Sequence, residues 1–202
     1  MTALEVADWR RQVFALYETV RTTPDVADGH TLWREGRDRL FAQHPSTPVM
    51  AADLPSFAGL PVEPYDPAWR FELPVIAAEP AHFVFETGTD GVVPFDRLGI
   101  VEVPGVGSLD VWRLTSYGGG IFVPVRDALA GRHGGTYGGG RYLIDSIKGA
   151  LLQSTATSLV LDFNFAYNPS CAYDPAWACP LAPLGNRVPV EIPVGERYFG
   201  SY

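Results

Sequence analysis

Hydrophobic residues recur every three or four positions along the first part of the chain. Between residues 4 and 22 they are Leu4, Trp9, Val13, Leu16, Tyr17 and Val20. This spacing places them on one side of an α-helix and therefore predicts an amphipathic helix. The run Thr22-Thr23-Pro24-Asp25 ends that helix, because proline does not continue a helical pattern.

A second helix is predicted for residues 28–43. Its apolar face comprises Leu32, Trp33, Gly36, Leu40 and Phe41, and its polar face comprises Arg34, Glu35, Arg37, Asp38 and Arg39. Two histidines bracket this helix. We expect His30 to lie at the surface and His44 to be stabilised by the partial negative charge at the helix C-terminus.

From Pro45 onward the pattern changes to short alternating runs separated by glycine and proline. These runs predict β-strands at 57–60, 70–78, 82–86, 92–103, 109–114, 121–125, 137–144, 159–165 and 188–192, with a turn at 88–91. Because no helical pattern separates them, we expect antiparallel pairing in a barrel or a sandwich. The predicted fold class is mainly β (α+β), with an N-terminal helical segment (1–45) packed on a β-rich domain (46–202).

The charge pattern limits the expected partners. The chain has 202 residues, a net charge of −8 and a single lysine, Lys148. An acidic surface repels phosphate groups, so neither nucleic acids nor anionic membranes are expected partners. No apolar run reaches the ~20 residues of a membrane-spanning helix, and the N-terminus lacks the pattern of a secretory signal. We therefore expect a cytoplasmic protein with reduced cysteines.

The densest group of chemically useful residues lies between Thr136 and Arg187. Three consecutive glycines, 138–140, precede Arg141 there. Consecutive glycines let backbone N–H groups approach a ligand closely, and a guanidinium binds carboxylates or phosphates. The glycines fit a β-bulge or a barrel corner equally well, so both interpretations stay open.

A predicted strand at 159–165 carries two further polar candidates. Alternation puts Asp162 and Asn164 on the same face of that strand. A buried arginine needs a carboxylate, so Asp162 is the expected partner of Arg141, and we expect both at the wall of a cavity. The expected rim of that cavity comprises three other polar residues, Tyr137, Asn168 and Glu196.

The two cysteines lie eight residues apart, at Cys171 and Cys179, with no histidine near them in the sequence. Four interpretations remain open: buried inert thiols, a disulfide that closes the loop, a nucleophile, or a pair of metal ligands. We expect the two thiols to be close in space and reduced in the cell.

Two blocks, TYGGGRYL and LDFNFAYNPSCAYDPAWACPLAPLGNRVPVEIPVGE, resemble the C-terminal signature of the bacterial domain of unknown function 1684 family. The earlier blocks WREGRDRLFAQHPSTPV, FAGLPVEPYDPAWRF and GGGIFVPVRDA are also similar to that family, so the resemblance runs from about residue 33 to 196. The matching positions are Arg70, Asp127, Thr136, Tyr137, Gly138, Gly139, Gly140, Arg141, Asp162, Asn164, Tyr167, Asn168, Pro169, Cys171, Cys179, Asn186 and Glu196. The family has no established activity, so the resemblance indicates a site rather than a reaction.

Residue chemistry and the resemblance together give a set of candidate site residues. The catalytic candidates are Asp162, Glu196 and Tyr137. The substrate-binding candidates are Arg141, Asn164, Tyr167, Asn168 and Asn186, and the candidate thiols are Cys171 and Cys179. The four histidines and two cysteines lack metal-ligand spacing, so we expect no metal and no other cofactor.

Three functions are compatible with these residues. The first is a metal-independent enzyme that acts on a small, possibly anionic organic molecule in a β-barrel pocket by acid–base chemistry such as hydrolysis, elimination or cyclisation. The second is a non-catalytic protein that binds a small ligand in an aromatic-lined cup. In the third, the signature residues form a structural clasp whose polar groups satisfy one another. The sequence favours an enzyme or a ligand site over the clasp.

Overall fold

The computed structural model describes residues 1–87 and 91–200, so most of the turn predicted at 88–91 lies outside the described residues. Two helices form as the hydrophobic spacing predicts. Helix α1 (Ala3–Thr22) begins at a capping box in which Thr2 and Glu5 accept each other's backbone N–H groups. Helix α2 (Val26–Gln43) is capped at its N-terminus by Asp25, whose carboxylate accepts N–H groups of the first turn.

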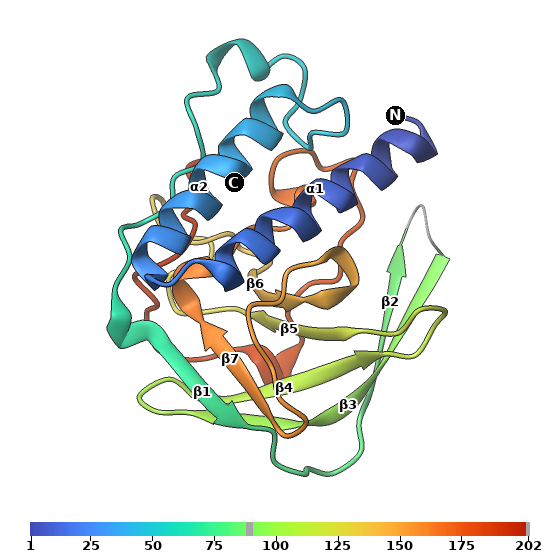
Figure 1. The fold of residues 1–202 in the computed structure, drawn as a ribbon. Helices are drawn as coiled ribbons and strands as arrows, with labels where there is room; N and C mark the ends of the chain where they lie inside the picture. Colours follow the sequence, from blue (N-terminus) through green and yellow to red (C-terminus); the bar gives the residue numbers. More distant parts are fainter. Residues whose placement is uncertain (88–90, 201–202) are drawn as a thin grey trace.

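Seven strands follow the helices in the described residues, and all their pairings are antiparallel. One sheet has five strands in sequence order: β2 (His82–Thr87), β3 (Gly91–Val103), β4 (Gly107–Leu114), β5 (Ile121–Val125) and β6 (Arg141–Asp145). The other sheet pairs β1 (Arg70–Pro74) with β7 (Ser158–Asp162). Figure 1 shows α1 and α2 side by side above these strands.

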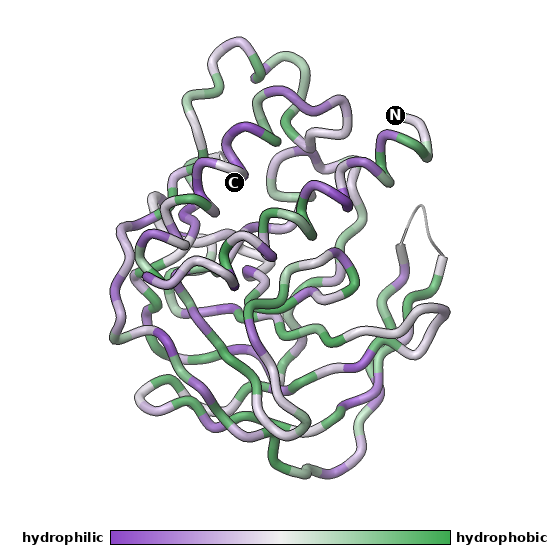
Figure 2. Tube along the Cα trace, in the orientation of Figure 1, coloured by the Kyte–Doolittle hydropathy of each residue, from purple (hydrophilic) through white to green (hydrophobic). Residues whose placement is uncertain are grey.

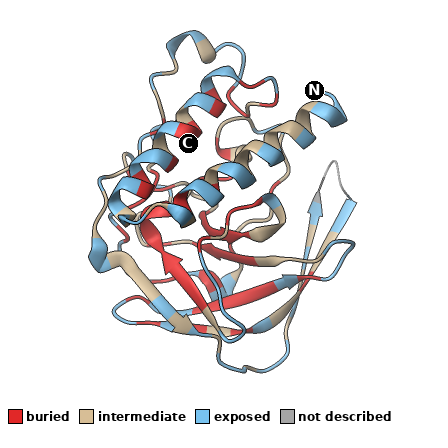
Figure 3. Ribbon diagram, in the orientation of Figure 1, coloured by how far each residue is buried: buried red, intermediate tan, exposed pale blue. Residues whose placement is uncertain are grey.

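The two-stranded sheet lies between the helices and the larger sheet. On β7, Leu159 and Leu161 join the core shared with the five-stranded sheet, whereas Val160 packs in the cluster of Tyr17 and Trp33 beneath the helices. In Figure 3, β7 is therefore buried while the outer faces of the helices are exposed. Hydropathy follows the same division, with apolar residues concentrated along the inner strands (Figure 2).

The structure confirms a mainly β fold with two N-terminal helices and two antiparallel sheets. The sheets face each other across one core, as in a sandwich. A closed barrel is the wrong alternative, because in the described residues the two sheets are linked only by single bridges such as that between Ile76 and Ile100. None of the described helices is long and apolar enough to cross a membrane.

Several predicted strands are shorter than expected or absent. Residues 57–60 and 188–192 form no strand, and the strand predicted at 159–165 ends at Asp162. In the 188–192 segment, Pro189 has no N–H to donate to a ladder. The carbonyls that follow it bind a side chain of the interior instead, as described below.

Three expectations about the helices are also wrong. Leu4 is exposed, because α1 extends beyond the core at its N-terminal end, whereas His30 and Arg37 are buried. His30 donates from Nε2 to the carbonyl of Asn164 at 3.0 Å, and burial lowers the pKa of this histidine. The neutral imidazole thus joins α2 to the end of β7.

Candidate functional site

Arg141 lies at the start of β6, and its side chain is 1% exposed. Nη2 donates to Asp127 Oδ2 at 2.7 Å and to the Ile192 carbonyl at 3.2 Å. Nη1 donates to the carbonyls of Val194 and Glu196. One guanidinium therefore binds three alternate carbonyls, those of residues 192, 194 and 196, and holds this C-terminal segment against β6.

The expected pair of Arg141 with Asp162 is wrong. The register of the β5–β6 hairpin sets Val125 opposite Arg141, so Asp127, two residues past the end of β5, reaches the guanidinium. Asp162 pairs instead with Arg70, at 3.1 Å. Each carboxylate thus satisfies a different buried or half-buried cation.

Close chain packing explains two of the three glycines before Arg141, whereas a Cβ on Gly138 would meet nothing nearer than 3.7 Å. Gly140 has φ +93, and a Cβ there would lie 2.7 Å from the carbonyl oxygen of Val125. A Cβ on Gly139 would meet the ring of Tyr137 and the side chain of Leu181 at 2.7 and 2.8 Å. The turn into β6 therefore requires glycine for backbone geometry, which favours the structural interpretation.

Asp162 and Asn164 do lie together, although the strand stops between them. Asn164 donates from its backbone N–H and its Nδ2 to Asp162 Oδ1, at 3.1 and 2.8 Å. The Asn164 amide also bonds both backbone groups of Asp66, at 2.8 Å each. Burial raises the pKa of Asp162, and hydrogen bonds from Asn164 and Arg70 oppose that shift. Both side chains fasten the 65–70 segment to the end of β7.

Glu196 is fully buried, and its carboxylate connects α2 to the signature residues. It accepts from Arg37 Nη2 at 2.7 Å, from the backbone N–H of Asn168 at 3.1 Å and from Asn168 Nδ2 at 3.2 Å. Burial raises the pKa of Glu196, and Arg37 and Asn168 oppose that shift. The guanidinium of Arg37 lies about 5 Å from the rings of Trp33, Phe41 and Tyr167.

Asn186 and Tyr167 are the two remaining substrate-binding candidates. Asn186 accepts the indole N–H of Trp112 at 2.8 Å and donates to two main-chain carbonyls, those of Asp110 and Pro124. It therefore bridges β4 and β5. Tyr167 exchanges backbone hydrogen bonds with Tyr142 and places its ring against Arg37. Neither residue lines a pocket found among the described residues.

The two cysteines are free thiols that lie close together, as expected. Donation from the Cys171 thiol and from the backbone N–H groups of Cys171 and Ser170 lowers the pKa of Cys179 to about 6. The Cys171 thiol donates a hydrogen bond to the Cys179 sulfur. This hydrogen bond and burial together raise the pKa of Cys171. Tyr137 donates from its hydroxyl to the Cys171 carbonyl and sulfur, at 3.4 and 3.6 Å.

This arrangement predicts that both thiols react slowly in the folded protein. In native protein at pH 7, Ellman's reagent is expected to react slowly with both, because Cys179 is 5% exposed and Cys171 is held as a protonated thiol. After denaturation the reagent should count two thiols. A disulfide that survives in freshly lysed cells blocked with an alkylating agent would contradict the expectation of reduced cysteines.

A pocket of about 910 Å³ opens beside Cys171. It lies where residues 49–61, the loop 168–175 and residues 197–200 meet. Three signature residues line it, Tyr137, Asn168 and Cys171. Its other walls are mostly apolar or aromatic, and include Val49, Leu60, Phe57, Tyr173, Tyr198 and Phe199. This volume is in the range of small-molecule sites.

Two polar atoms on residues of this pocket have no hydrogen-bond partner among the described residues. They are Asn168 Oδ1 and the Tyr173 hydroxyl, and both atoms are buried. A buried polar atom without a partner costs about 1–3 kcal/mol. The orientation of the Asn168 amide is nevertheless well defined, because Nδ2 donates to two acceptors, Glu196 Oε1 and the Arg197 carbonyl at 2.9 Å.

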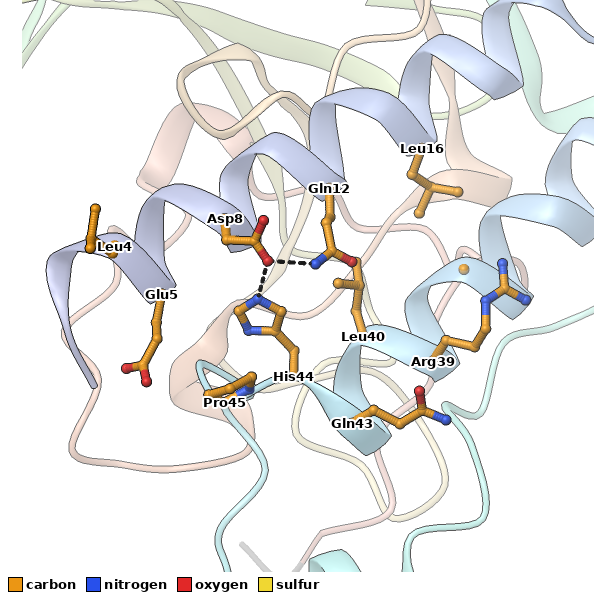
Figure 4. A pocket seen from close by; sticks show the side chains of 11 residues that line it. Leu4, Glu5, Asp8, Gln12, Leu16, Arg39, Leu40, Gln43, His44 and Pro45 are labelled. Atoms are coloured by element: carbon orange, nitrogen blue, oxygen red, sulfur yellow. Dashed lines mark hydrogen bonds and ion pairs between the residues drawn. The ribbon is translucent and has the colours of Figure 1, made fainter.

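A second hollow, of about 680 Å³, lies between α1 and the C-terminal half of α2. Figure 4 shows Asp8, Gln12 and His44 turned toward one another there, with Asp8 accepting from both partners. His44 lies at the C-terminus of α2, as expected, and its Nδ1 accepts the Ser46 N–H. Both ring nitrogens are thus used within the protein, so His44 offers no free group to a ligand.

The family model described as Protein of unknown function (DUF1684) matches residues 55–197, more than two thirds of the chain. This protein belongs to that family. A solution NMR structure of an uncharacterized protein from Haloarcula marismortui is 30% identical, has a TM-score of 0.57, and aligns over 84% of this chain and 92% of that one. A search of curated proteins found no match.

The DUF1684 match includes most of the pocket wall and excludes both helices. The hollow between α1 and α2 is therefore lined by residues outside the matched region, whereas Leu60, Tyr137, Asn168, Cys171 and Tyr173 lie within it. The similarity expected for residues 33–54 is not part of this match. Among the described residues, no group of three or more His, Cys, Asp or Glu side chains is placed to hold a metal ion.

Sequence reasoning missed four residues that matter here. Asp127 and Arg37 complete the two buried ion pairs, and Tyr173 and Arg197 lie in the pocket wall. Asp127 was among the positions that match the family pattern, but its role as the partner of Arg141 depends on the register of the β5–β6 hairpin. Arg37 carried no signal, because its helical position falls on the polar face and only tertiary packing buries it.

Proposed function

We propose that this DUF1684 protein binds a small organic molecule in the pocket formed by residues 49–61, 168–175 and 197–200. The observation that carries the proposal is Asn168, a residue of the pocket wall whose buried Oδ1 has no hydrogen-bond partner among the described residues. The protein tolerates the cost of this buried acceptor, and a ligand that donates a hydrogen bond to it would remove that cost.

Binding without catalysis is the better-supported version. The two strongest acid–base candidates, Asp162 and Glu196, are held in ion pairs with Arg70 and Arg37, and neither lines this pocket. Of the two cysteines, Cys171 lines the pocket and Cys179 does not. The pKa of Cys171 is raised, which makes its thiol a poor nucleophile at neutral pH. Asp53 is the one carboxylate among the residues found to line the pocket, and it is exposed, so an enzyme would lack a desolvated base there.

The clasp hypothesis describes a different part of the signature. Arg141, Asp162, Asn164 and Asn186 have their described hydrogen-bond partners inside the protein, and we assign them to stability. Tyr137, Asn168 and Cys171 connect this interior to the pocket. The signature therefore contains both a structural part and a ligand-binding part.

Fragment titration followed by amide NMR tests the proposal. We expect saturable shifts at Leu60, Asn168 and Tyr173 when a mixed library of neutral, cationic and anionic fragments is screened at pH 7, with little change at Gln12. Ala58→Trp, which adds an indole at the pocket wall, should abolish these shifts. Ala15→Trp, at an exposed position of α1 outside both hollows, should leave them unchanged.

Shifts confined to the hollow between α1 and α2 would contradict the proposal. So would the absence of any saturable shift at the pocket residues in the folded protein.

A further inference from the structure

We infer that the ligand of this pocket is a neutral aromatic molecule that carries a hydroxyl group. The inference rests on the proposed binding function and adds the chemical class of the ligand. In this arrangement the ligand hydroxyl donates to Asn168 Oδ1, and the Tyr173 hydroxyl donates to the ligand oxygen. The aromatic body lies against the apolar walls.

The lining favours an aromatic body. Five aromatic side chains line the pocket: Phe57, Tyr137, Tyr173, Tyr198 and Phe199. Non-aromatic apolar side chains, among them Val49, Met50, Leu60 and Pro61, also line it. Rings in such a pocket gain both from burial of apolar area and from edge-to-face contacts with the protein's own rings.

The charges favour a neutral ligand over the anionic one considered from sequence. Arg197 is the only arginine or lysine among the residues found to line the pocket. Its Nε donates to Glu63 at 2.8 Å and its Nη2 to the Pro193 carbonyl at 3.2 Å. Arg141, the anion-binding candidate, is buried elsewhere with its own carboxylate. A carboxylate in the pocket would be desolvated without a free cation to pair with.

The two unpartnered atoms favour a hydroxyl. Because Asn168 Nδ2 is fixed by Glu196 Oε1 and the Arg197 carbonyl, Oδ1 is the end of the amide left for a ligand, and it can only accept. The hydroxyl of Tyr173, whose ring packs edge-on against Phe41 at 5.0 Å, can donate. A hydroxyl oxygen provides both complementary roles, whereas an ammonium lacks an acceptor and a carboxylate lacks a donor.

Three probes with the same 4-ethylphenyl body separate these roles. 4-Ethylphenol both donates and accepts, 4-ethylanisole accepts only, and 4-ethyltoluene does neither. Calorimetry or NMR titration at pH 7 should give the tightest binding for the phenol. Each lost hydrogen bond is expected to weaken binding about 3–10-fold.

Tyr173→Phe identifies the protein group that donates. This variant should remove the advantage of the anisole over the toluene, while the phenol should keep its advantage over the anisole through Asn168 Oδ1. Because the lost hydroxyl has no described partner, the melting temperature should stay the same or rise by about 2 °C. Tyr117→Phe, at a fully exposed tyrosine, is the matched control and should change none of the three affinities.

Each contrary outcome has a separate meaning. Equal binding of the three probes, or binding of other fragments alone, would overturn the hydroxyl inference and leave the pocket function standing. A lower melting temperature in Tyr173→Phe with an equal loss for all three probes would show that this hydroxyl is structural. Failure of every fragment in the pocket would refute the proposed function itself.

Discussion

Arg141→Gln is expected to lower the free energy of unfolding by about 3–5 kcal/mol, the range for breaking one side of a buried ion pair. The substitution leaves the Asp127 carboxylate buried without its cation. It also removes donors from the carbonyls of Ile192, Val194 and Glu196, which hold the C-terminal segment against β6. Urea unfolding at pH 7, followed by tryptophan fluorescence, measures the change.

Arg132→Gln is the matched control. Arg132 also pairs with a carboxylate, that of Glu191, but both side chains are 59% exposed. Removing such a surface pair should change the free energy of unfolding by less than about 0.5 kcal/mol. If Arg141→Gln were no more destabilising than this control, the guanidinium would not be the fastening point of the C-terminal segment.

Glu196→Gln is expected to cost about 3 kcal/mol, because it leaves the Arg37 guanidinium nearly buried without a counter-charge. The loss should be local as well as global. Arg37 lies on α2, so hydrogen exchange should speed up more in α2 than in β4 of the five-stranded sheet. Equal acceleration in both elements would contradict the role of Glu196 in anchoring the helix.

The double variant Arg37→Met/Glu196→Gln separates the ion pair from the other contacts of each residue. If the two side chains act as a pair, the double variant should be less destabilised than the sum of the single variants. Additive losses would mean that Asn168 and the aromatic rings around Arg37, rather than the ion pair, account for the effect.

The sequence predicted those elements that local periodicity defines. Helical spacing located both helices, and alternation located β3, which alternates in burial over Gly99–Val103. The apolar runs of β4 and β5 were also located, although both faces of these two strands are buried. Local periodicity failed at residues 188–192, which alternate like a strand. Val188 and Val190 each make one backbone hydrogen bond to residues 126–128, and Pro189 donates no N–H, so no continuous ladder forms.

The candidate site residues stay predictions, and the structure shows where they lie. Arg141, Asp162, Asn164 and Asn186 are all interior, whereas Tyr137, Asn168 and Cys171 line the pocket. Which residues pair depends on strand register and on contacts across the whole chain, so Asp127 and Arg37 could not be assigned as partners. Tyr173 was not among the candidates, because an unpartnered hydroxyl has no signature in sequence.

The most direct test of the pocket is a crystal structure of the protein soaked with 4-ethylphenol. We predict density for the ring between residues 49–61 and the 168–175 loop, with the phenol oxygen within about 3 Å of Asn168 Oδ1 and of the Tyr173 hydroxyl. Density for the probe only in the hollow between α1 and α2, or a phenol that binds the pocket with its hydroxyl turned to solvent, would contradict this prediction.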